Sequence, residues 1–230
     1  MNPDRKLWNQ QQQTLRKALS NRESFQDAMA LFLIQHAMVH AEEMSHAGMW
    51  SFEDEILEDL SKSQMCFIPH DCEHSIAWVL WHLSRIEDVT MNILVAGSPQ
   101  VLLCEDWLER MEISIQSTGN GMSADGMMEL SISINLAALR SYRFAVGRRT
   151  REIAKQLCPE DLGRKVEPAR LQQIVKERTV DIKNGDLLDY WSSLTVAGLL
   201  LMPPTRHNFI HLNEALRIRQ LTIRSAIRGY

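Results

Sequence analysis

Apolar residues recur at steps of three and four over long parts of this chain, which is the pattern of amphipathic α-helices. Four stretches are long enough to build a core, and each has a cap or a breaker near its ends. They cover residues 10–48, 72–96, 124–157 and 203–226. Between them we find no alternation of apolar and polar residues that predicts a strand. The pattern predicts an all-α fold, a four-helix bundle whose long connections carry short helices.

Local signals place the ends of these helices. Gly97, followed by Ser98 and a proline, should end the second helix, and a break near Asn21 would divide the first. Pro203-Pro204 should open the fourth helix, because proline is favoured in a first turn, where its missing N–H costs nothing. The candidate N-caps are Asp71 or Ser75 for the second helix and Ser123 or Asp125 for the third.

Length and composition describe a soluble globular protein. The 230 residues suffice for one domain, which we assign to 1–230. The chain is 45% hydrophobic and 23% charged, and its net charge of −4 argues against a general nucleic-acid binder. The start, MNPDRKLWNQQQQ, lacks the apolar core of a signal peptide, and the run around Leu199 to Met202 is too short for a membrane span. We therefore expect a cytoplasmic protein.

The chemistry suggested by the sequence centres on His207 and His211. At four residues apart they lie on one face of a helix, in a spacing that chelates a divalent metal. Because a catalytic ion usually takes three protein ligands, a third must come from elsewhere, and His82 in the second predicted helix is the best candidate. We expect Zn²⁺ first, with Ni²⁺, Fe²⁺ and Mn²⁺ as alternatives.

The order of these motifs resembles a known family. Trp78-x-x-x-His82, followed far along the chain by His207-x-x-x-His211, is similar to the DinB/YfiT-like superfamily of metal-binding four-helix bundles. The resemblance implies a divalent metal on His82, His207 and His211. Members include S-transferases and isomerases that use bacterial low-molecular-weight thiols. It thus implies transfer of a thiol to a small electrophile, with the thiol as co-substrate.

Other functions stay open at this point. The same ion could activate water for hydrolysis, or it could only staple the bundle of a stress-response or binding module. A ferritin-like di-iron site needs Glu-x-x-His, whereas here the order is His40-x-x-Glu43 and His211-x-x-Glu214. A zincin needs His-Glu-x-x-His, and position 208 is Asn. Three histidines without a fourth protein ligand favour an open site, since structural zinc sites are usually closed by four ligands.

Four further residues are candidates for additional ligands or for partners of the ligands. His36 and His40 form a second His-x-x-x-His, and His40 is either a fourth ligand or a pocket residue. Glu214 is either a hydrogen-bond partner of a ligand or a solvated charge. Trp81 neighbours His82 and is the better pocket candidate of the two tryptophans nearby. The catalytic residues themselves are unknown.

The remaining polar residues give weaker signals. We expect the three charged residues after His82 (Arg85, Glu87 and Asp88) to be solvated or paired. The cysteines lie far apart without a CxxC, so we expect free thiols. A small zinc loop from Cys66, His70, Cys72 and His74 is disfavoured by the single-residue gap between its last two members. We expect a small-molecule substrate, and no nucleic acid or membrane. The sequence leaves monomer and homodimer open.

Overall fold

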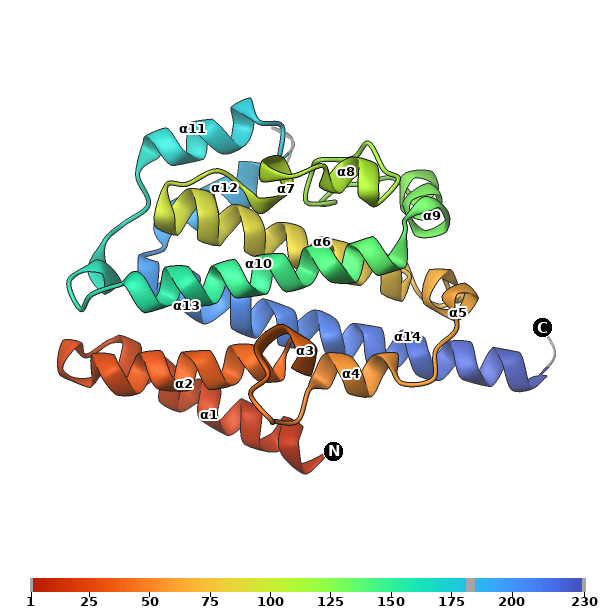
Figure 1. The fold of residues 1–230 in the computed structure, drawn as a ribbon, viewed down its shortest axis with the longest axis horizontal. Coiled ribbons are helices and arrows are strands. Elements are labelled where there is room, and N and C mark those ends of the chain that lie inside the picture. The colour runs from red at the N-terminus through yellow and green to blue at the C-terminus, as the bar shows by residue number, and fades with distance from the viewer. Residues whose placement is uncertain (1, 181–184, 229–230) are drawn as a thin grey trace.

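The computed structural model describes residues 2–180 and 185–228, and within these residues all regular structure is helical apart from one isolated bridge, Lys165 to Thr195. The helices of the core run side by side as a bundle (Figure 1). They are α2 (Phe25–Met38), α6 (Ile76–Asp88), α10 (Leu136–Gln156) and α14 (Asn208–Arg228). Helix α6 packs against both α10 and α14, and all of its residues are buried. The predicted all-α bundle is confirmed.

The first predicted helix, 10–48, is wrong as a single element. Helix α1 (Pro3–Leu19) begins earlier, and it ends at Ser20, before a 3₁₀ turn at Arg22–Ser24 that leads into α2. Asn21 caps this turn, accepting a hydrogen bond from the N–H of Glu23 at 3.1 Å. The polar sequence Ser-Asn-Arg-Glu-Ser therefore lets the chain turn back. Trp8 and Gln35 then join the two helices by exchanging side-chain-to-carbonyl hydrogen bonds.

The second helix ends as its local signals predict. The hydroxyl of Ser75 accepts a hydrogen bond from the N–H of Trp78 and caps α6. Helical structure continues past Asp88 as a π-helical segment, Val89–Ala96, and stops at Gly97, which has a left-handed φ of 66°. A residue without Cβ adopts this conformation at no steric cost.

The third predicted helix, 124–157, is two helices. Helix α9 (Ala124–Ser133) is capped by Ser123, and α10 begins after Asn135, whose side chain accepts from the N–H of Ala138 at 3.2 Å. The prediction did not treat Asn135 as a cap. An Asn that competes for backbone N–H groups favours a new helix start over the middle of a helix.

The fourth helix does not begin at Pro203. A short helix, α13 (Val196–Leu201), precedes it and passes through a π-helical segment, Met202–His207, directly into α14. The two prolines therefore lie inside a continuous helical path. Because proline lacks an N–H and its ring clashes with the carbonyl one turn earlier, the path takes the wider π turn there.

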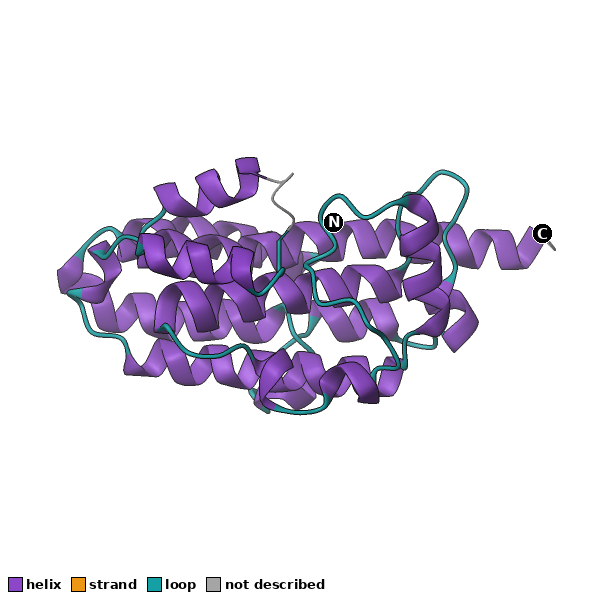
Figure 2. Ribbon diagram, turned by 90° about the horizontal axis from the view of Figure 1, so that it is seen from above, coloured by secondary structure: helices purple, strands orange, loops and turns teal. Residues whose placement is uncertain are grey.

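Shorter helices fill the connections. Figure 1 shows α11 outside the bundle, over the π-helical end of α6, and Figure 2 shows the last turns of α14 extending beyond the other helices. None of the helices described crosses a membrane, since each is too short or too polar. The shorter elements are α3 (Glu42–Ser45), α4 (Phe52–Leu57), α5 (Lys62–Cys66), α7 (Val101–Cys104), α8 (Trp107–Arg110), a 3₁₀ turn (Asp161–Gly163), α11 (Pro168–Lys176) and α12 (Gly185–Ser193).

Candidate metal centre

A column of three aromatic rings leads along α6 to His82. Trp78 and His82 lie one turn apart on α6, and His74 lies in the loop just before the helix, four residues ahead of Trp78. His74 stacks on Trp78 with ring centroids 3.7 Å apart, and Trp78 stacks on His82 at 4.8 Å, both pairs nearly parallel. The column fixes the plane of the His82 imidazole.

The loop that carries Thr118 fixes the tautomer of His82. The Nδ1–H of His82 donates to the backbone carbonyl of Thr118 at 2.6 Å. The neighbouring Gly119 has a φ of 84°, and a Cβ there would lie 3.2 Å from the Trp78 ring. Glycine is thus required for the loop to approach so closely. With its proton on Nδ1, neutral His82 presents a lone pair on Nε2.

Helix α14 brings the other two imidazoles to the same point. His207 ends the π-helical segment, His211 follows one turn later, and their ring centroids are 4.5 Å apart. Both rings lie about as close to His82, at 5.1 and 5.0 Å. The Nε2 atoms of His82 and His207 are 3.3 Å apart. Two nitrogens sharing one tetrahedral ion at about 2.0–2.1 Å would be roughly 3.3–3.4 Å apart, so this spacing fits a metal.

Hydrogen bonds on the side of His211 that faces away from the other two rings fix the orientation of its imidazole. The Nδ1–H of His211 donates to one oxygen of Glu214 at 2.7 Å, and Nδ1 of His74 lies 2.6 Å from the other. Partial burial disfavours the charge on Glu214, but these hydrogen bonds outweigh it and lower its pKa to about 2. Glu214 is therefore an ionised acceptor that holds His211 with Nε2 towards the other two rings.

His82 and His207 are in the protonation state that a metal requires. Burial, followed by the proximity of His211, lowers the pKa of His82 to about 4. Burial, followed by the proximity of His82, lowers the pKa of His207 well below its usual range. Both are neutral at neutral pH and do not need to lose a charge-bearing proton before binding an ion.

The triad (His82, His207 and His211) is buried on one side and accessible on the other. His82 is only 2% exposed, whereas His207 and His211 are partly exposed, as are Glu214 and His74 next to them. Among residues 2–180 and 185–228, no fourth histidine, cysteine or carboxylate joins this group of ligand atoms. An ion held here would keep at least one position for water or substrate.

Two of the other predicted site residues lie in a separate cluster, the core cluster, made of His36, His40 and Glu87. Nε2 of His36 lies 2.8 Å from one oxygen of Glu87, and Nε2 of His40 lies 3.0 Å from the other. All three side chains are fully buried. His40 therefore contacts Glu87 in this structure, and the assignment of a role to either histidine stays a prediction.

Trp81 and the charged residues of α6 lie in the interior. Trp81 is fully buried near Tyr142, and it is Trp78 that stacks on His82. Arg85 and Asp88 are buried and paired at 3.0 Å, and Tyr142 donates to Asp88. The expectation that these charges are solvated or paired is met by pairing, in the interior of the protein. Their hydrophilic type alone gave no sign that α6 is enclosed on all sides.

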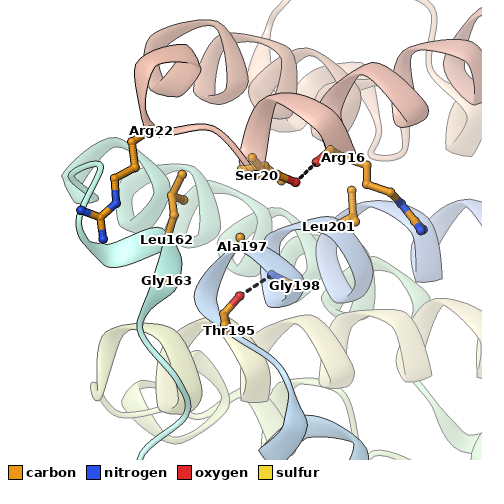
Figure 3. A pocket seen from close by; sticks show the side chains of 10 residues that line it. Arg16, Ser20, Arg22, Leu162, Gly163, Thr195, Ala197, Gly198 and Leu201 are labelled. Carbon is orange, nitrogen blue, oxygen red and sulfur yellow. Dashed lines mark hydrogen bonds between the residues drawn. The ribbon is translucent and has the colours of Figure 1, made fainter.

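Other polar groups do not assemble into a metal site in the described residues. Cys66 and Cys72 are free, His70 is fully exposed, and His74 binds Glu214 instead. Figure 3 shows a pocket of about 380 Å³ between α1, the 3₁₀ turn at 161–163 and α13, with Arg16 and Arg22 at opposite ends. Its lining contains no histidine, cysteine or carboxylate, so it is not a metal centre.

Comparison with known families gives one match. The family described as the DinB superfamily matches residues 49–202. This range includes His82 and its aromatic column, and it ends before His207 and His211. No curated protein matches the chain.

Proposed function

The chain belongs to the DinB superfamily, and from this we propose that it is a metal-dependent enzyme that transfers a low-molecular-weight thiol to a small electrophile at His82, His207 and His211. One observation carries the proposal: three imidazoles converge on a point that is closed on one side and open on the other. Such a geometry suits a bound ion with a free position.

The residues around the triad support an ion better than any other ligand. Thr118 and Glu214 each accept the outward Nδ1–H of one imidazole, as ligands of a metal require. A divalent ion there, with Zn²⁺ expected first, would hold an incoming thiol as thiolate or lower the pKa of a bound water. The partly exposed side, near His211 and His74, is where the thiol and the electrophile would approach.

Membership of the superfamily, whose members include enzymes that use small thiols, is the reason to propose transfer rather than hydrolysis. Hydrolysis needs a group that can move protons between water and leaving group, and the carboxylate bonded to the triad is Glu214. It already accepts from two imidazoles, and its pKa of about 2 keeps it ionised. In the proposed thiol transfer, a bond forms from sulfur to the electrophilic carbon, the leaving group departs with its bonding pair, and the proton lost from S–H is taken up by the leaving group.

The setting that we propose for this activity is the cytoplasm, where small thiols are kept reduced. The substrate would be a small molecule, and we expect neither nucleic acid nor membrane as a partner.

Metal analysis combined with a thiol-consumption screen tests this function. Protein purified without added metal is analysed for its elements, and then mixed with small thiols and a panel of electrophiles. We expect bound metal, and thiol consumption that is lost in His211→Ala but kept in His70→Ala, whose side chain is fully exposed. Bound metal without turnover would support a binding module in which the ion only stabilises the bundle. Protein that neither carries metal nor takes it up would contradict both.

A further inference from the structure

We propose that the core cluster, His36, His40 and Glu87, is a second divalent-cation site, separate from the triad and closed off from solvent. This inference is independent of the reaction that the triad performs. It comes from the donor set, the spacing of the donors and the charge of the protein interior. Two imidazoles and one carboxylate are a ligand set that binds Fe²⁺, Mn²⁺ or Zn²⁺.

The donor atoms already lie almost at the spacing of a coordination shell. The carboxylate oxygens of Glu87 are 2.8 and 3.0 Å from Nε2 of His36 and of His40. Ligands that share a tetrahedral ion at about 2.0–2.1 Å are roughly 3.3–3.4 Å apart, so each pair has to open by only a few tenths of an ångström. The imidazole ring centroids are 4.4 Å apart, close to the 4.5 Å of His207 and His211 in the triad.

The surrounding helices hold these three side chains in place. Asn208, the first residue of α14, donates to Glu87 at 2.9 Å and accepts from Arg143 at 3.2 Å. Helix α10 approaches His40 through Gly147, where a Cβ would lie 3.1 Å from the imidazole. The cluster is thus assembled from α2, the residues just after it and α6, and it is braced by α14 and α10.

The charge balance of the interior favours a cation at this place. Among the residues whose burial the structure describes, five that carry charge at neutral pH are fully buried: Glu53, Arg85, Glu87, Asp88 and Arg143. Arg85 pairs with Asp88 and Arg143 pairs with Glu53, which leaves Glu87. Among the described residues only histidines form ion pairs with Glu87. A buried carboxylate without a cationic partner is costly, and a divalent ion would supply the missing positive charge.

Protonation favours the ion and also limits its affinity. Burial disfavours the charge on Glu87, but the two histidines outweigh it and lower its pKa, while burial lowers the pKa of His40 to about 3. An ion on Nε2 would move each imidazole proton to Nδ1, which has no acceptor in the described structure for either histidine. Such acceptors contribute about 10–100-fold in affinity, and in the triad only Nδ1 of His207 lacks one, so the core cluster should bind more weakly than the triad.

Metal stoichiometry tests the second site. The full chain is unfolded with a chelator, refolded with excess Zn²⁺, freed of loose ions by gel filtration and analysed for zinc. We expect two ions in the parent and in His70→Ala, and one ion in each of Glu87→Gln, His40→Gln and His211→Ala. In equilibrium competition with a mild chelator, the folded protein should lose the core ion at the lower chelator concentration, because its site is weaker.

The outcomes separate this proposal from the proposed function. A parent that holds only one ion, lost in His211→Ala and kept in Glu87→Gln, would overturn the core site and leave the triad intact. Two ions retained in Glu87→Gln would also overturn it. Circular dichroism will show whether the core variants fold. If they do not, zinc-edge anomalous scattering from crystals of the parent tests the site. We expect an anomalous peak between His36, His40 and Glu87, and the absence of this peak would refute the site.

Discussion

The triad and the core cluster both contain histidines one turn apart, and both use a residue of α6, yet they differ in where each imidazole directs its N–H. In the triad, His82 and His211 donate outwards to Thr118 and Glu214, which leaves Nε2 of each facing inwards. In the core cluster the Nε2 atoms of His36 and His40 already contact Glu87. The partners of the imidazoles, rather than their spacing along the helix, therefore distinguish a site prepared for metal from one that must rearrange.

The second difference is exposure. The triad borders solvent at His211 and Glu214, whereas the core cluster is fully buried. We therefore expect changes at the partly exposed His211 to act on metal binding with little effect on the metal-free fold. Changes in the core cluster should act strongly on the fold itself.

The largest effect should follow from the loss of a triad ligand. Structural zinc sites contribute about 10–16 kcal/mol, so one of three ligands is worth on the order of 4 kcal/mol, or about 1,000-fold in affinity. His82→Ala and His211→Ala should each weaken zinc binding by at least this factor, measured by competition with a chromophoric chelator. His70→Ala is the control, and should bind like the parent. Equal zinc affinity in His82→Ala, His211→Ala and His70→Ala would show that the triad does not bind the ion.

Breaking the core cluster should instead lower the stability of the metal-free protein. Glu87→Ala leaves buried N–H donors of His36, His40 and Asn208 without their acceptor. The free energy of unfolding of the metal-free protein should fall by about 3–5 kcal/mol, as when one partner of a buried pair is removed. Urea unfolding with chelator present measures it. Glu129→Ala, on an exposed position, should change it by less than about 0.5 kcal/mol. A similarly small effect of Glu87→Ala would contradict the role of this carboxylate.

The metal-free protein should lose stability in mild acid. The pKa of His82 is about 4 and that of His40 about 3 when folded, against 6.5 when unfolded. Between those values the unfolded chain binds more protons, so stability is greatest above pH 6.5 and falls as the pH drops. Each histidine contributes on the order of 3 kcal/mol to this loss. Urea midpoints from pH 7 to pH 4 should show the fall, with a gentler slope in His82→Gln. A flat profile would show that the histidines are not held neutral.

The smallest effects should come from the outward partners of the triad. Glu214→Gln weakens the acceptor of His211 and should reduce zinc affinity by about 10–100-fold. His74→Phe keeps the stack on Trp78 but loses the contact with Glu214, so we expect less than about tenfold. The same chelator competition measures both. An effect of His74→Phe larger than that of Glu214→Gln would show that the ring column, rather than the carboxylate, orients His211.

The sequence predicted the bundle because its four core helices carry clear three-and-four periodicity and end at strong signals such as Ser75 and Gly97. It indicated the break near Asn21, but it missed the division at Asn135, where a polar residue could continue a helix or cap a new one and only packing decides. It also misplaced the start of the last helix, because prolines that normally open a helix lie here inside a π-helical segment.

The candidate site was predictable only as far as spacing along one helix allows. His207 and His211 were apparent as a pair, and His82 as a histidine in a second apolar helix. The partnership of His36 and His40 with Glu87 was not, because it joins residues about fifty positions apart and depends on how α2 packs on α6. The same holds for His74 and Thr118, whose contacts with Glu214 and His82 come from loops.

Cobalt spectroscopy of the triad tests the central claim most directly. In a His40→Gln background, where only the triad is expected to hold an ion, the protein is loaded with one equivalent of Co²⁺ and its visible spectrum is recorded before and after addition of a small thiol. We predict that thiol shifts the ligand-field bands and adds a sulfur-to-cobalt charge-transfer band, and that both changes vanish in His211→Ala. A spectrum that thiol leaves unchanged, or one that responds equally without His211, would contradict an open three-histidine metal site.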